Sequence, residues 1–117
     1  MAIPYKNLDV DESADQIKGE RGKITFLYAI NMTAAKLYLK FYDALNADVT
    51  VGTTVPVLTF PIPTTGDTNG AGFVFPIPEE GLEFRTGITV AATTGIADND
   101  AGAPGANAVA ICVGYRE

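Results

Sequence analysis

Residues 36–63, KLYLKFYDALNADVTVGTTVPVLTFPIP, carry the clearest strand signal of the chain, its longest turn and the first copy of a repeated phrase. In residues 36–43, Leu37, Leu39 and Phe41 alternate with polar or aromatic residues. This period of two predicts a β-strand with one face in a core. The phrase TFPIP at 59–63 returns as VFPIP at 74–78. Proline cannot donate a ladder hydrogen bond, so both phrases are predicted to lie at the margins of a sheet.

The rest of the chain is predicted to supply the strands that pair with or pack against this one. Residues 23–31 alternate Ile24, Phe26, Tyr28 and Ile30 with other residues that include apolar ones, which predicts a central strand. The link at 31–35 fits a hairpin or an arch between two sheets. Further strands are predicted at 55–62, 73–77, 82–84, 87–94 and 108–115, with loops at 44–54, 63–72 and 95–107. This spacing, without a long helical pattern, predicts an all-β protein, an antiparallel β-sandwich of jelly-roll or immunoglobulin-like topology.

Residues 1–22 differ in composition from the remainder, because eight charges are scattered among few apolar residues. We predict an extended N-terminal arm at 1–22 and a β-sandwich domain at 23–117. Such an arm orders on binding, with its apolar residues docked on a partner. The alternative is that residues 11–18 form a first strand of the sandwich or one helical turn. The predicted interface residues are those of the arm and two tyrosines on the outward side of 36–43: Ile3, Tyr5, Leu8, Val10, Tyr38 and Tyr42.

Composition and charge exclude several classes of protein. The 117 residues are 47% hydrophobic and 19% charged, which fits one folded domain with a modest core. The net charge is −6, and no Lys and Arg cluster is present to follow a phosphate backbone, so nucleic acid is not an expected partner. No apolar run reaches about 18 residues, and the start MAIPYKNLD has no signal-peptide pattern, so a soluble, unprocessed chain is expected. The single cysteine, Cys112, is predicted to be a small buried hydrophobe in a protein made in a reducing cytoplasm.

Catalytic equipment is sparse. The chain has no histidine and one serine, Ser13, so Ser-His-Asp and Cys-His systems are excluded and the usual metal ligands are missing. The acidic groups at 67–70, 79–83 and 98–100 lack the spacing of known protease, glycosidase or calcium sites, and they are predicted to be solvated turns. We therefore predict no catalytic, cofactor-binding or metal-binding residues. A small carboxylate-dependent enzyme remains a minor alternative.

Several short motifs, in order, carry a resemblance over about residues 24–116. They are LKFY at 39–42, VGT at 51–53, PVL at 56–58, the two FPIP phrases, GLEF at 81–84, TGI at 86–88, TTGIADND at 93–100 and VGYR at 113–116. This series resembles small structural proteins of tailed-bacteriophage virions. The resemblance implies a non-enzymatic decoration or cement protein, made in the bacterial cytoplasm, that binds the major capsid protein on the outer surface of the head. The sequence departs from the pattern by a longer insert at 64–71.

Two further expectations accompany this resemblance. Capsid lattices offer threefold positions, so a homo-oligomer is expected, with a trimer favoured. The alternative function is a carbohydrate- or host-surface-binding β-sandwich module of a phage tail or fibre. In that case the five tyrosines of the chain would stack on sugars, although no tryptophan is present.

Overall fold

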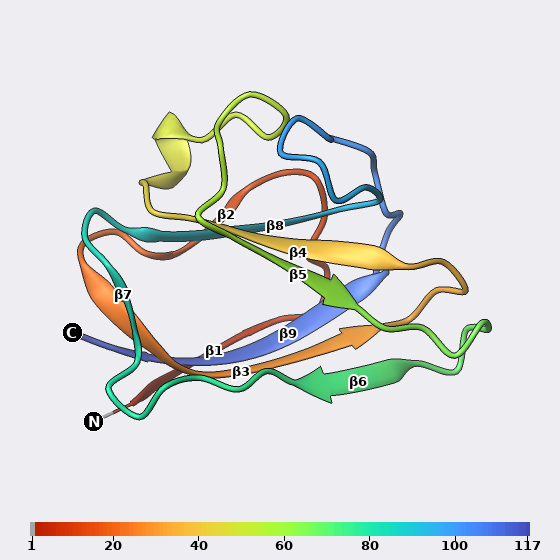
Figure 1. Cartoon of the computed structure of the whole chain (residues 1–117), viewed down its shortest axis with the longest axis horizontal. Helices are drawn as coiled ribbons and strands as arrows, with labels where there is room; N and C mark the ends of the chain where they lie inside the picture. The colour runs from red at the N-terminus through yellow and green to blue at the C-terminus, as the bar shows by residue number, and fades with distance from the viewer. Residues whose placement is uncertain (1) are drawn as a thin grey trace.

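The computed structural model describes residues 2–117 and contains two antiparallel β-sheets packed face to face (Figure 1). The strands are β1 (Ile3–Asn7), β2 (Asp15–Lys18), β3 (Gly22–Asn31), β4 (Leu37–Tyr42), β5 (Leu58–Ile62), β6 (Ala71–Val74), β7 (Leu82–Phe84), β8 (Ile88–Thr93) and β9 (Val109–Arg116). One short 3-10 helix, η1 (Asn46–Asp48), lies in the loop after β4. The predicted all-β class with two antiparallel sheets is confirmed.

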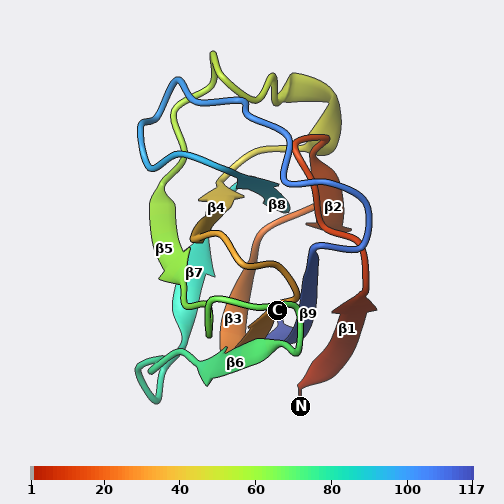
Figure 2. The same ribbon diagram turned by 90° about the vertical axis from the view of Figure 1, so that its right-hand side faces the viewer.

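Each sheet combines strands from distant parts of the sequence. The five-stranded sheet has the order β1-β9-β3-β6, and β7 pairs with β3 on the same side as β6. The four-stranded sheet has the order β2-β8-β4-β5. Strands β3 and β4 thus belong to different sheets, so the link between them is an arch and not a hairpin. Figure 2 shows the two sheets edge-on, with β5 and β6 at one open side of the sandwich.

The core lies between the sheets and is built by side chains at alternate strand positions. Leu37, Leu39 and Phe41 of β4 are buried in it, as their alternation predicts. In β3 the alternation changes phase, because a bulge lies between Ile24 and Phe26. Ile24 and Leu27 therefore both point into the core, while the predicted grouping of Ile24 with Phe26, Tyr28 and Ile30 on one side is wrong.

The predicted N-terminal arm is not confirmed. Strand β1 pairs with β9 along its whole length, and β2 pairs with β8. Between them Val10 is fully buried, and its N–H donates to the carbonyl of Val109 at 2.9 Å. Few apolar residues suffice here because β8 and β9 supply the rest of the local core. The alternative strand at 11–18 is the one the structure contains, as β2, and Met1 lies outside the described residues.

Prolines lie next to the two strand limits that differ most from the prediction. β5 begins at Leu58, after Pro56, and β6 ends at Val74, before Pro76. Proline is confined to strand ends and edge strands because it cannot donate to the ladder, and β5 and β1, which contain Pro61 and Pro4, are edge strands. The predicted strand at 55–62 is present but shorter, the one at 73–77 is displaced to 71–74, and β7 has the predicted limits.

Candidate docking face

The outer face of the four-stranded sheet is covered by the chain itself. Two long loops, residues 43–57 and 94–107, lie over it at the top of Figure 1. The loops touch each other, since a Cβ built on Gly52 would lie 3.1 Å from the Cβ of Ala101. Asp100 braces the second loop by accepting hydrogen bonds from the N–H groups of Gly95 and Gly102, at 3.2 and 2.8 Å. Most outward side chains of β4 and β8, the two central strands of this sheet, are therefore covered by the loops and do not face solvent directly.

Lys40 fastens one of these loops to the sheet. Its side chain points outward from β4, is fully buried, and its Nζ donates to the carbonyls of Ala97 and Asp100 at 2.6 and 3.1 Å. Burial lowers the pKa of the Lys40 ammonium, and the negative charges of Asp100 and Asp98 oppose this shift. The sequence predicted a solvent-facing side for this strand, but the loops take the place of solvent.

The outer face of the five-stranded sheet has no such cover among the described residues (Figure 1). Strand pairing arranges the outward side chains of its middle part in three rows, beside a charged row of Glu83, Lys23 and Arg116 at the end of the sheet where β7 lies. The three rows are Val74, Tyr28, Cys112 and Lys6; then Gly72, Ile30 and Ala110; then Phe26, Gly114 and Pro4. We call these ten residues the bare face.

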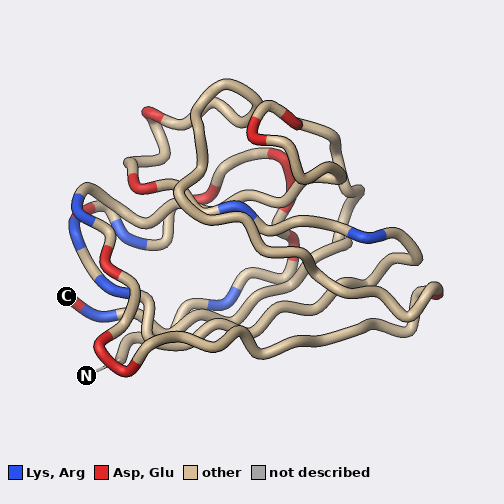
Figure 3. Tube along the Cα trace, viewed as in Figure 1, with Lys and Arg blue, Asp and Glu red and all other residues tan. Residues whose placement is uncertain are grey.

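The bare face is almost entirely apolar. Phe26 is 46% exposed and Val74 is 55% exposed. A shallow hollow of about 780 Å³ lies on it, lined by Phe26, Cys112, Pro4 and Lys6 among others. Lys6 is the one charged residue in the three rows. Figure 3 shows that the acidic residues gather on the loops and at the ends of the molecule, away from the middle of this sheet.

Glycine makes the close packing on the bare face possible. The ring and hydroxyl of Tyr28 lie across Gly72, where an added Cβ would collide with the tyrosine oxygen. Tyr28 is thereby laid flat against the neighbouring strand and is only half-exposed. Phe26, Val74 and Cys112 remain exposed beside it, and exposed apolar side chains of this kind gather at interaction surfaces.

The predicted interface residues do not come together on one surface. Ile3 and Leu8 are exposed at the β1 edge, Tyr5 is half-buried against the core, and Val10 is buried. Tyr38 is half-buried and Tyr42 is fully buried on the loop-covered face. Burial and the Asp15 charge raise the pKa of the Tyr5 phenol, while a hydrogen bond from Asn7 opposes them. Val10 and Tyr42 are thus parts of the fold and not of a docking surface.

Sequence reasoning missed the residues of the bare face, above all Phe26, Val74 and Cys112. Cys112 was predicted to be buried, but it is exposed, because the apolar neighbours Ile111 and Val113 take the inward positions of β9. The available signal was the run of apolar residues on both sides of residues 23–31. That pattern indicates a central strand, but it is equally compatible with a sheet whose outer face is apolar.

The acidic turns are separate from one another. Asp67 is exposed, and its carboxylate accepts hydrogen bonds from Thr65 and Asn69 within its own turn. These hydrogen bonds lower the pKa of the Asp67 carboxyl. Glu79, Glu80 and Glu83 are also exposed. Within residues 2–117, no group of three His, Cys, Asp or Glu side chains is placed to hold a metal ion.

Comparison with known proteins gives no relative. No family model, no curated protein and no solved structure matches the chain. In the part of the chain that the structure describes, no helix is long and apolar enough to cross a lipid bilayer. The function therefore has to be argued from the surfaces of the molecule.

Proposed function

We propose that the protein is a non-enzymatic structural component of a tailed-phage virion, which attaches to the outer surface of the capsid through the bare face and stabilises the particle. The observation that carries this proposal is the contrast between the two sheets. One outer face is covered by loops, whereas the other presents aromatic and aliphatic side chains to the outside. Exposed apolar patches of this kind mark interaction sites in soluble proteins. The resemblance of residues 24–116 to virion proteins names the partner, the major capsid protein.

The size of the bare face favours several copies acting together. Three rows across four strands, with strands about 4.8 Å apart and rows about 7 Å apart, cover roughly 400 Å². A standard interface buries about 800 Å² on each partner. One copy would therefore bind a capsid weakly, while a ring of copies engages several sites at once and gains avidity. We propose a trimer, because capsids offer threefold positions.

We also propose that the topology is of the jelly-roll type rather than immunoglobulin-like. Six of the eight successive connections cross from one sheet to the other, whereas β4–β5 and β6–β7 stay within one sheet. Each sheet thus interleaves strands from both halves of the chain, as two Greek keys do. Jelly rolls occur in viral capsid proteins and in lectins, so this topology agrees with a virion protein without specifying one.

A binding measurement with undecorated heads of the parent phage tests the proposed function. Phe26 exposes 46% of its surface, roughly 90 Å² of a side chain near 200 Å². At about 25 cal/mol per Å², losing this contact costs about 2 kcal/mol, or roughly thirtyfold in affinity. Phe26→Ser should therefore bind heads about thirtyfold more weakly in a co-sedimentation assay.

The matched control is Val55→Ser, because Val55 is 66% exposed but lies on a loop over the other sheet. This variant should bind heads as tightly as the wild-type chain. The proposal fails if the wild-type protein leaves undecorated heads bare in negative-stain images. It also fails if Phe26→Ser and Val55→Ser bind equally well.

A further inference from the structure

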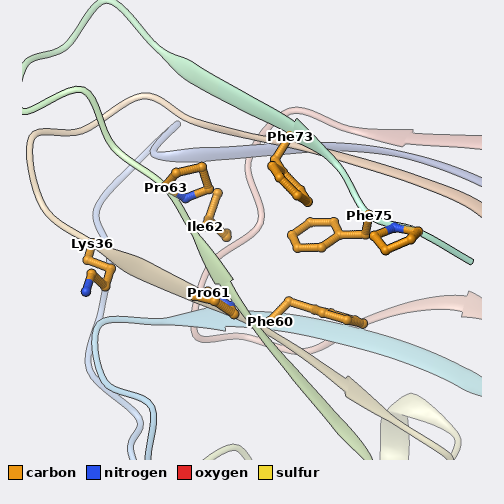
Figure 4. Close-up of a pocket in the computed structure, with 8 residues that line it drawn as sticks. Lys36, Phe60, Pro61, Ile62, Pro63, Phe73 and Phe75 are labelled. Carbon is orange, nitrogen blue, oxygen red and sulfur yellow. The ribbon is translucent and has the colours of Figure 1, made fainter.

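The repeated phrase forms a second apolar site, away from the bare face. Phe60 of the first copy and Phe75 of the second lie with ring centroids 4.7 Å apart, and Phe73 meets Phe75 at 5.0 Å. Together with the adjoining prolines they line a groove of about 570 Å³ between β5 and β6, the outer strands of the two sheets. Figure 4 shows Lys36 at one end of this groove and the phenylalanine rings toward the other.

The lining restricts what the groove can bind. Three phenylalanines, three prolines and one isoleucine accompany Lys36, so the ammonium of Lys36 is the one side-chain hydrogen-bonding group that lines the groove. Sugars, nucleotides and inorganic anions need several polar groups to replace their hydration, and they are disfavoured here. The volume lies within the range of sites that enclose a small ligand or a few side chains.

The prolines also decide how a peptide would lie. Pro61 and Pro63 on one wall, and Pro76 on the other, have no backbone N–H. A segment added as a further β-strand would therefore lack donors from these walls. An extended polyproline II segment does not need them, because it docks its side chains on aromatic grooves and keeps its backbone solvated. The fixed φ of proline also keeps the groove preformed.

Lys36 adds a charge requirement. Its side chain is exposed, and within residues 2–117 the single ion pair of the structure joins Lys18 and Glu20. No carboxylate of the described chain neutralises Lys36. A ligand that lies along the groove would therefore gain by placing a carboxylate at this end, next to its apolar part.

We propose that the groove binds a short extended segment of a partner protein, about five residues long, apolar and proline-containing, with an acidic residue at the end that meets Lys36. The length follows from the five residues of β5, which forms one wall. The site goes beyond the proposed capsid attachment, because it lies at the open side of the sandwich and shares no residue with the bare face. Failure of one proposal therefore leaves the other standing.

Titration of the isotope-labelled full chain with two peptides tests this proposal by NMR. The probes are acetyl-Glu-Pro-Leu-Pro-Leu-amide and its Gln counterpart. We expect the Glu peptide to shift the amide signals of β5 and β6, and the Gln peptide to bind about fivefold more weakly, as for a partly exposed ion pair. In Lys36→Gln the two peptides should bind equally, whereas Lys6→Gln, a lysine on the bare face, should keep the difference.

Phe73→Ala tests the apolar part of the site. Phe73 is 45% exposed, so the variant should fold, and it should bind the Glu peptide at least tenfold more weakly. Val57→Ala, an exposed valine outside the groove, should bind normally. The proposal is overturned if neither peptide binds at about 1 mM, if the shifts map elsewhere, or if decanoate binds where the peptides do not. Self-association that Phe73→Ala abolishes would also overturn it, by making a second copy the occupant.

Discussion

Asp43 is expected to hold the two sheets in register at one end of the sandwich. It follows β4 directly, and its carboxylate accepts hydrogen bonds from the N–H groups of Arg85, Thr86 and Gly87 at 3.1, 2.8 and 3.4 Å. These residues connect β7 of one sheet to β8 of the other. Asp43→Ala removes all three hydrogen bonds and leaves the three N–H groups to water.

The expected loss follows from these contacts. A hydrogen bond to a charged group contributes about 1.5–3 kcal/mol. One of the three is long and the carboxylate is partly exposed, so water replaces much of the total. We expect the free energy of unfolding to fall by about 2 kcal/mol, which corresponds to a drop of about 8 °C in the midpoint for a chain of this size.

The effect of Asp43→Ala should depend on pH. Desolvation raises the pKa of the Asp43 carboxyl. The backbone hydrogen bonds from Thr86, Arg85 and Gly87 and the Arg85 charge lower it by more, so the net effect is a lowered pKa. A lowered pKa in the folded state means that the stabilisation is complete above the ordinary aspartate pKa, about 3.9, and is lost as the pH falls through the folded pKa. The difference between wild type and variant should be constant from pH 5 to 7 and shrink toward pH 3.

Urea unfolding followed by circular dichroism measures this difference, since the chain has no tryptophan. Asp48→Ala is the matched control, because Asp48 is an exposed carboxylate in the neighbouring loop. The reasoning is refuted if Asp43→Ala loses less than about 0.5 kcal/mol at pH 7. It is equally refuted if the loss is the same at pH 3 as at pH 7.

Three further substitutions test the fold. Val10→Ala should lower the free energy of unfolding by about 2 kcal/mol in urea titrations, because Val10 is fully buried; a free arm would show no loss. Tyr42→Phe should be neutral or stabilising by up to about 1 kcal/mol, since the buried Tyr42 hydroxyl has no hydrogen-bond partner among the described residues; a clear destabilisation would contradict this. Lys40→Met should speed amide exchange at residues 95–102 at least tenfold, while Lys36→Met, on an exposed lysine, should not; equal exchange in both would show that Lys40 does not fasten the loop.

Local pattern was enough to find the central strands. Leu37, Leu39 and Phe41 alternate over a whole strand, so β4 was predicted within one residue at each end. Strand β1 was not assigned, and β2 was given only as an alternative to the arm, because each contributes little apolar area. β1 is fixed by pairing with β9, about 100 residues away in sequence, and β2 by pairing with β8, about 75 residues away. Such pairing is not local, and periodicity within a short segment does not reveal it.

The candidate site was harder to predict than the fold, for a related reason. A period of two separates the sides of a strand, but it does not say whether the second side meets solvent, a loop or a partner. The outward side chain of Tyr42 is buried under a loop, whereas those of Phe26 and Val74 are exposed to solvent. The bulge between Ile24 and Phe26 added an error, because it reversed the side on which the later residues of β3 lie.

The reactivity of Cys112 on assembled particles tests the central claim most directly. Cys112 is the one cysteine of the chain and is exposed. It lies in the same row of the bare face as Tyr28, between the other two rows. Its alkylation by N-ethylmaleimide should be at least tenfold slower on head-bound protein than on free protein. A Cys112→Ser, Thr53→Cys variant, which carries its thiol on a loop over the other sheet, should react at similar rates in both states. Equal rates for Cys112 in the free and the head-bound protein would contradict docking through the bare face.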